Sequence, residues 1–167
     1  MQYPYFERKN KVYKIGVLVN DLRPSTMSYS LIDLGNKIAR DHIDIDFYVF
    51  NQDWQNPPHT ISFPLLQQKN IWGFHGTLIS TNLDTTQKLL VMPNTAKKLF
   101  YVWNIFEYQS LPNAKHVYDI YQHPDLTLIG RSVEYSSILQ NNFNQTVQTL
   151  EDFNYGGLLE IIRYRKS

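Results

Sequence analysis

Cysteine is absent from this chain of 167 residues, and glycine and proline are scarce, at 7 and 8 residues. Without cysteine there are no disulfide bonds, thiolate metal ligands or cysteine nucleophiles. Long apolar runs are also lacking, and none approaches the roughly 20 residues that a membrane-spanning helix requires. The first ten residues are aromatic and charged, which is not the pattern of a signal peptide. We therefore expect a cytoplasmic protein without a membrane span.

An excess of charge of one sign is missing too. The chain has 16 lysines and arginines against 15 acidic residues, a formal net charge of +1. This balance gives no electrostatic reason to expect nucleic acid as a partner. Hydrophobic residues make up 43% and charged residues 19%, enough apolar material for one folded core. We expect residues 1–11 to form a tail or edge segment and residues 12–167 a single domain.

Motifs that bind phosphate or activate a serine are not found. The chain contains neither G-x-G-x-x-G, nor the P-loop pattern, nor a G-x-S-x-G elbow. No two histidines stand four residues apart around a carboxylate, as a helical zinc site requires. His116 and His123 flank Asp119, which we interpret as a solvated helix surface. The sequence thus predicts no cofactor and no metal site.

Apolar and β-branched segments alternate with segments of helical period. Strands are predicted at 12–19, 44–50, 71–80, 98–105 and 126–130, with a weak strand at 146–150 and a short edge strand near 60–63. Helices are predicted around 27–38 and at 82–92, 114–122, 133–142 and 156–164. This alternation predicts an α/β, Rossmann-like, doubly wound and mostly parallel sheet of five or six strands with helices on both faces.

Gly35 interrupts the first predicted helix, where glycine costs about 1 kcal/mol relative to alanine. We expect the helix to approach the sheet closely at this position. In a doubly wound sheet, ligands bind where the strands end. The loops of interest are therefore residues 20–26, 51–54, 80–82, 104–108 and 131–132.

Four segments resemble the N-terminal domain of GT-B-type glycosyltransferases: residues 30–40 (SLIDLGNKIAR), 71–81 (IWGFHGTLIST), 100–104 (FYVWN) and 128–132 (LIGRS). The resemblance covers about residues 12–163, one of the two Rossmann-like domains of such enzymes. It implies an acceptor-side half that is incomplete for sugar transfer alone. A separate donor-binding domain or a homo-oligomer would complete the cleft, with a sugar or nucleotide-sugar as ligand. The loop after the first strand departs from the family because it has no glycine.

Two residues are candidates for the general base. Asp21 follows the first strand, where a carboxylate can deprotonate an acceptor hydroxyl. The alternative is a turn in which Asp21 bonds nearby backbone and pairs with Arg23. His75 stands between glycines, which allow a ligand to approach, and histidine titrates near neutral pH. The alternative there is a half-buried histidine that bonds the backbone.

Polar and aromatic residues at the predicted strand ends are candidates for binding. Residues 80–82 and 131–132 each open a helix, which favours either an anion or ordinary capping. The aromatic cluster around Trp103 suits either a ligand wall or a protein interface. The predicted substrate-binding residues are Arg23, Ser80, Thr81, Asn82, Trp103, Asn104, Glu107, Arg131 and Ser132.

Two other functions compete with the glycosyltransferase hypothesis. A non-enzymatic protein-binding module on the same scaffold would use the aromatic loops. A flavodoxin-like nucleotide-binding domain would need phosphate-loop glycines, and the chain lacks them.

Overall fold

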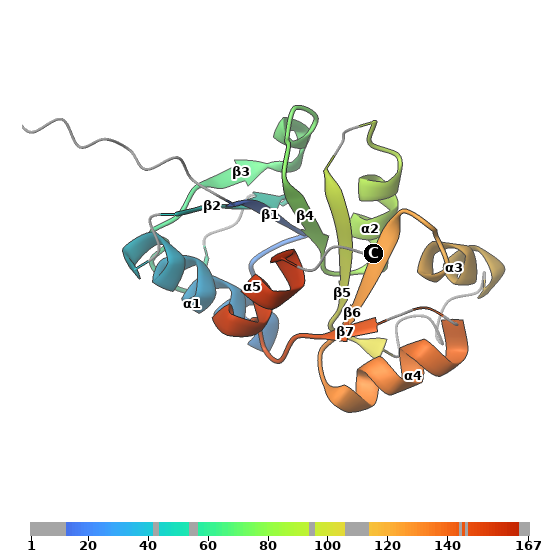
Figure 1. Cartoon of the computed structure of the whole chain (residues 1–167). Helices are drawn as coiled ribbons and strands as arrows, with labels where there is room; N and C mark the ends of the chain where they lie inside the picture. The colour runs from blue at the N-terminus through green and yellow to red at the C-terminus, as the bar shows by residue number, and fades with distance from the viewer. Residues whose placement is uncertain are drawn as a thin grey trace, which may run out of the picture.

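The computed structural model describes residues 13–41, 44–53, 57–93, 96–105, 114–143, 145 and 147–163. Within them lies one sheet in which every neighbouring pair of strands is parallel (Figure 1). The strand order is β3-β2-β1-β4-β5-β6-β7. The strands are β1 Tyr13–Val19, β2 Ile45–Asn51, β3 Leu65–Gln67, β4 Thr77–Ser80, β5 Lys97–Val102, β6 Leu126–Gly130 and β7 Val147–Thr149.

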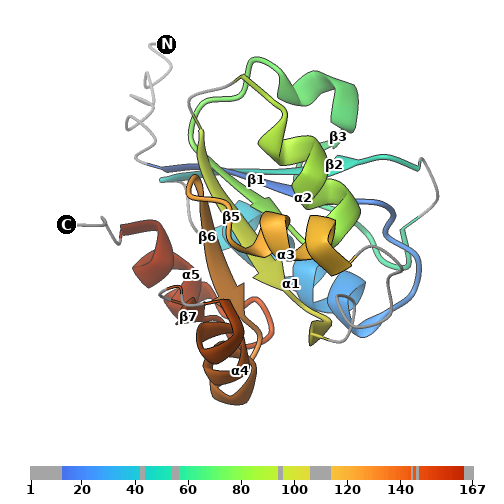
Figure 2. The same ribbon diagram turned by 90° about the vertical axis from the view of Figure 1, so that its right-hand side faces the viewer.

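Helices cover both faces of this sheet. They are α1 Thr26–Asp41, α2 Leu83–Leu90, α3 Ala114–Tyr121, α4 Val133–Phe143 and α5 Tyr155–Arg163, with a 3₁₀ turn, η1, at Gln68–Ile71. The apolar sides of α1 and α5 share one core cluster, whereas α2, α3 and α4 pack on the opposite face. Figure 2 shows α2 and α3 in front of the strands and α1 behind them. The predicted α/β architecture is therefore confirmed, and its topology is compatible with a Rossmann-like fold.

The residue pattern of the strands explains this layering. In β1, Val17 and Val19 contribute to the core beneath α1, and Leu18 between them contributes to the core on the other face. All three side chains are fully buried. Strands buried on both faces are continuously apolar instead of alternating with polar residues, which is the pattern of this segment.

The strand count of five or six was too low, because the described residues form a sheet of seven strands. The edge strand expected near residues 60–63 lies instead at Leu65–Gln67. Its position follows from Pro64, which has no N–H to donate but whose carbonyl accepts a hydrogen bond from the Val49 N–H at 3.1 Å. Pairing with β2 consequently begins after the proline.

The strand predicted at 71–80 was wrong over its first six residues. η1 ends at Ile71, the Phe74 N–H bonds back to the Ile71 carbonyl at 2.9 Å, and β4 begins only at Thr77. Gly76 has a φ of +139°. A Cβ there would lie 2.4 Å from the Lys14 carbonyl oxygen, so a tight backbone approach replaces the expected strand.

The expectation for Gly35 is confirmed. A Cβ at this position would lie 2.4 Å from two ring carbons of Phe63 and 2.8 Å from a ring carbon of Phe47 on β2. The two rings meet edge to face, with centroids 5.4 Å apart. Glycine therefore allows α1 to lie close against the sheet.

Among the described residues no helix combines the length and apolar character needed to cross a bilayer. The same residues contain no group of three or more histidine, cysteine or acidic side chains placed to hold a metal ion.

Candidate functional site

The loops after the strands gather at one edge of the sheet because all strands run in the same direction. We call this side the carboxyl edge; in Figure 1 the chain after β1, β5 and β6 lies at the bottom of the view. β1 and β4 are neighbours in the sheet, although β2 and β3 lie between them in sequence. β2 and β3 lie on one side of β1 and the later strands on the other, so the strand order reverses at this point. Such switch points are where open α/β sheets bind ligands. Most predicted site residues end or follow β1, β4, β5 or β6 and so share this edge, namely Asp21, Arg23, Ser80, Thr81, Asn82, Trp103, Asn104, Arg131 and Ser132.

One predicted residue among those described is not part of this group. His75 precedes β4 and is exposed at the opposite, amino edge. Of the glycines around it, Gly76 allows a close backbone approach to Lys14. Gly73 faces open space, since a Cβ there would meet nothing within 4 Å. The structure therefore does not bring His75 and Asp21 into one site. Glu107 lies outside the described residues.

Asp21 forms a turn with Arg23. Its carboxylate accepts the Arg23 backbone N–H at 2.9 Å and lies 3.7 Å from the Arg23 Nε atom. The Asp21 side chain is 29% exposed. This is the turn geometry that the sequence offered as the alternative to a general base, and it leaves part of the carboxylate open to solvent.

Ser80 and Thr81 use their hydroxyls inside the fold. Ser80 Oγ shares a 2.7 Å hydrogen bond with Thr86 Oγ1 on α2. Thr81 Oγ1 donates to the Leu18 carbonyl of β1 at 2.8 Å. Both residues are buried, so these hydroxyls fasten α2 and β1 to the end of β4.

Asn82 caps α2. Its Oδ1 accepts the Thr85 N–H at 2.8 Å, and Thr85 Oγ1 accepts the Asn82 N–H at 3.2 Å. This reciprocal pair is a capping box, which satisfies backbone donors at a helix start. Of the two alternatives at residues 80–82, the hydrogen bonds of Asn82 match ordinary capping.

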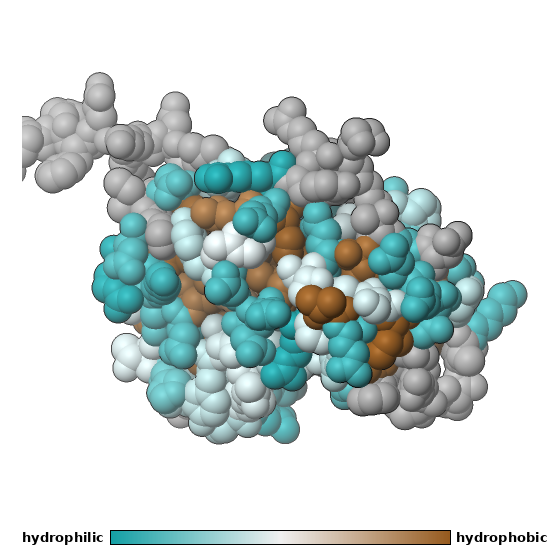
Figure 3. Space-filling view, turned by 60° about the horizontal axis from the view of Figure 1, so that its bottom comes forward, coloured by the Kyte–Doolittle hydropathy of each residue, from teal (hydrophilic) through white to brown (hydrophobic). Residues whose placement is uncertain are grey.

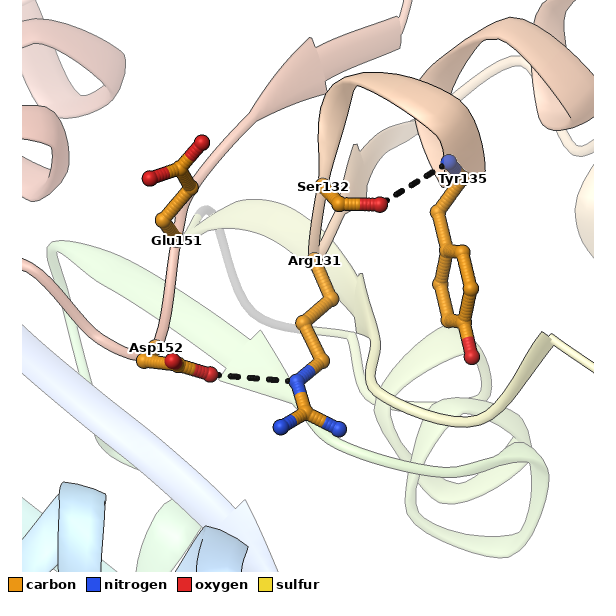
Figure 4. Close-up of a pocket in the computed structure, with 5 residues that line it drawn as sticks. All are labelled: Arg131, Ser132, Tyr135, Glu151 and Asp152. Atoms are coloured by element: carbon orange, nitrogen blue, oxygen red, sulfur yellow. Dashed lines mark hydrogen bonds and ion pairs between the residues drawn. The ribbon is translucent and has the colours of Figure 1, made fainter.

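A pocket of about 310 Å³ lies between the ends of β6 and β7. Its walls are formed by Arg131, Ser132, Tyr135, Glu151 and Asp152, and we call it the β6/β7 pocket. Figure 4 shows the two acidic residues on one turn, Arg131 and Ser132 on the other and Tyr135 on α4, with the Arg131 side chain extending to Asp152. The Arg131 Nε atom lies 3.1 Å from Asp152 Oδ1, and Ser132 Oγ accepts the Tyr135 N–H at 3.2 Å to cap α4.

Gly130 and Ser136 fix the spacing between α4 and the strands beneath the pocket. A Cβ on Gly130 would lie 2.3 Å from Ser136 Oγ and 2.6 Å from Ser136 N. Ser136 Oγ shares a 2.7 Å hydrogen bond with Thr149 Oγ1 of β7. The helix start therefore sits directly on β6 and β7, which holds the pocket walls together.

Trp103 joins this pocket to the end of β5. The guanidinium carbon of Arg131 lies 3.8 Å from the centroid of the Trp103 ring, a cation–π distance. Trp103 also stacks on Phe153, with centroids 5.8 Å apart and planes 23° apart. The structure thus brings together three of the predicted residues, Trp103, Arg131 and Ser132.

The turn after β7 carries backbone strain. Asp152 has a φ of 41° and Phe153 a φ of 54°, left-handed values that non-glycine residues rarely adopt. The buried Tyr101 hydroxyl donates to the Leu150 carbonyl just before the turn, and burial is the main reason that its pKa is raised. Such strain persists only where the surroundings hold it, and it often occurs at functional sites.

Two asparagines at neighbouring strand ends have buried polar atoms without partners. Asn51, the last residue of β2, is 1% exposed, and neither its amide oxygen nor its amide nitrogen bonds a described residue. The amide oxygen of Asn20, which follows β1, is also buried and unpaired within the described part of the chain. A buried amide without a hydrogen-bond partner lowers the stability of the fold. The two asparagines therefore give the carboxyl edge beside the switch point buried polar groups that a ligand could satisfy.

Glu151, Asp152 and Tyr135 were missed by the sequence reasoning. The rule that loops after strands carry sites applied equally to the weak last strand, and extending it there would have found both carboxylates. No signal in the sequence indicated Tyr135. Asn51 lies in the loop of interest at 51–54, but nothing in the sequence indicated that its amide is buried without a partner among the described residues.

Comparisons with known proteins found no match to this chain among protein-family models, curated proteins or solved structures.

Proposed function

We propose that this chain is the acceptor-side half of a GT-B-type glycosyltransferase and needs a second domain or a second copy for sugar transfer. The β6/β7 pocket carries the proposal. It combines a guanidinium, two carboxylates and two hydroxyls beside Trp103 at the ligand-binding edge of a Rossmann-like sheet. Figure 3, in which this side comes forward, shows apolar areas separated by hydrophilic residues, which suits a polar ligand.

Asp21 is the general base in this proposal. The acceptor oxygen attacks the anomeric carbon of the donor, the bond from that carbon to the diphosphate breaks, and Asp21 takes the acceptor proton. The Asp21 carboxylate is 29% exposed and belongs to the loop after β1, next to the switch point. His75 has no role here, since it precedes β4 at the amino edge.

The distance between Asp21 and the β6/β7 pocket sets the size of the acceptor. β1 and β6 are separated by β4 and β5. At about 4.8 Å per strand, their ends are roughly 14 Å apart. A single sugar ring cannot reach from one to the other, so the acceptor is an oligosaccharide or a glycosylated molecule.

The donor belongs to the missing half of the cleft. The chain has no glycine-rich phosphate loop, and a nucleotide-sugar depends on such backbone donors for its diphosphate. Donor, acceptor and base are therefore aligned only when the second domain or second copy is bound.

Binding of an oligosaccharide library to the immobilised chain tests the proposal. We expect at least one oligosaccharide to bind, and Arg131→Ala to weaken it at least tenfold. Arg40→Ala is the matched control because Arg40 also pairs with a neighbouring carboxylate, at 3.0 Å from Asp41, but lies in the last turn of α1. Binding of a nucleotide-sugar such as UDP-glucose with no oligosaccharide binding would refute the assignment of this half.

A further inference from the structure

The charges around the β6/β7 pocket do not balance. Among the described residues, Arg131 is the one cation that lines it, and its Nε atom is already paired with Asp152 at 3.1 Å. Glu151 is exposed and has no ion-pair partner among the described residues. The lining therefore carries one uncompensated negative charge. A phosphate or carboxylate group entering the pocket would meet this charge at close range.

The hydrogen-bonding groups of the pocket suit hydroxyls. The Nη atoms of Arg131 donate to no described residue, so their N–H groups remain available to a ligand. The carboxylates of Glu151 and Asp152 only accept, and the hydroxyls of Ser132 and Tyr135 both donate and accept. Two neighbouring sugar hydroxyls match this set, because one accepts from Arg131 while the other donates to a carboxylate.

The walls are also held in place before any ligand arrives. Asp152 and Phe153 have left-handed backbone angles of 41° and 54°. Phe153 packs edge to face on Tyr101, with centroids 4.7 Å apart, and stacks on Trp103. Because these contacts hold the strained turn, the backbone that carries the two acidic side chains has a defined position, which favours selective binding.

We propose that the β6/β7 pocket binds an uncharged vicinal diol of a carbohydrate and discriminates against phosphorylated sugars. This inference rests on the proposed function and specifies the chemical class of its acceptor. The determinant of selectivity is Glu151, whose charge no cation in the described part of the chain offsets.

Titration by NMR tests this selectivity on the whole chain. The three tryptophans give three indole N–H signals, and Trp103→Phe identifies the one beside the pocket. The probes are the methyl glycosides of glucose, mannose and galactose and the matching sugar 6-phosphates, all at one ionic strength. We expect a neutral glycoside to shift the Trp103 signal and to bind at least tenfold tighter than its 6-phosphate.

Glu151→Gln removes the uncompensated charge and keeps the shape of the side chain. We expect it to reduce the preference for the neutral sugar at least fivefold. Glu160→Gln is the control, since it makes the same change at an exposed position on α5 that does not line the pocket. Dispersed amide spectra of both variants establish that they fold.

Three outcomes overturn the inference, and they separate it from the proposed function. Equal or tighter binding of a 6-phosphate at the Trp103 signal overturns the inference and leaves the acceptor role intact. The same holds if no monosaccharide shifts this signal while an oligosaccharide binds in an Arg131-dependent manner. If neither monosaccharides nor oligosaccharides bind, both proposals fall.

Discussion

Gly35→Ala tests whether close packing of α1 on the sheet outweighs helix propensity. Alanine stabilises a helix interior by about 1 kcal/mol relative to glycine. At this position, however, the new Cβ would lie 2.4 Å from the Phe63 ring and 2.8 Å from the Phe47 ring. Both phenylalanines are buried, at 6% and 4% exposure, so neither ring can swing into solvent.

The two effects can be compared in magnitude. Overpacking a well-filled core costs about 1–3 kcal/mol, which exceeds the gain of about 1 kcal/mol from propensity. We therefore expect Gly35→Ala to lower the free energy of unfolding by about 1 kcal/mol. For a chain of this size the melting temperature should fall by about 2–4 °C.

Urea unfolding followed by circular dichroism measures this change, with a double-mutant cycle to locate its cause. In the Phe63→Leu background the closest ring is gone, so Gly35→Ala should cost at least about 1 kcal/mol less than in the parent chain. Ala39→Gly, at an exposed position of the same helix, gives the propensity term alone. If Gly35→Ala stabilises the parent by as much as Ala39→Gly destabilises it, the rings move freely and the reasoning is wrong.

Three further predictions concern the elements around the carboxyl edge. Gly130→Ala should destabilise the chain by about 3 kcal/mol and weaken ligand binding, because its Cβ would lie 2.6 Å from the backbone nitrogen of Ser136; an unchanged midpoint in urea would contradict this. Burial raises the pKa of the Tyr101 phenol above its ordinary value of 10.0. The folded state therefore keeps a proton that the unfolded state loses above about pH 10. The free energy of unfolding should then fall by up to about 1.4 kcal/mol per pH unit. Denaturation at several alkaline pH values should show that this free energy falls less steeply with pH in Tyr101→Phe than in the parent chain. Asn82→Ala should cost about 1 kcal/mol through loss of the α2 cap, and no change in thermal melting would show that the capping box is dispensable.

Much of the fold could be predicted from the sequence because its signals are local. The apolar segment that forms β6 was predicted with its observed bounds, Leu126–Gly130. Gly35 indicated a close approach because glycine is unfavourable within a helix unless packing requires it. The start of β4 could not be read, since residues 71–76 are as apolar as a strand. Their turn depends on the contact between Gly76 and Lys14, which lies far away in sequence.

The candidate site was predicted less completely. Trp103, Arg131 and Ser132 were named because each follows an apolar strand, and the structure places them together. The role of Glu151 depends on its lack of a cation partner among the described residues. The polar character of Asn51 depends on its burial without a hydrogen bond to any of them. Both properties belong to the folded chain and are invisible in a local pattern.

The two ends of the sheet have a consequence for self-association. In the described part of the chain, the outermost strands, β3 and β7, have three residues each, so each edge there offers about 10 Å of strand backbone. A strand of another molecule would find few groups to pair with, and short edge strands are one way in which proteins resist fibril growth. We therefore expect concentrated solutions to remain free of ordered aggregates, and any second copy or second domain to dock through side chains instead of extending the sheet.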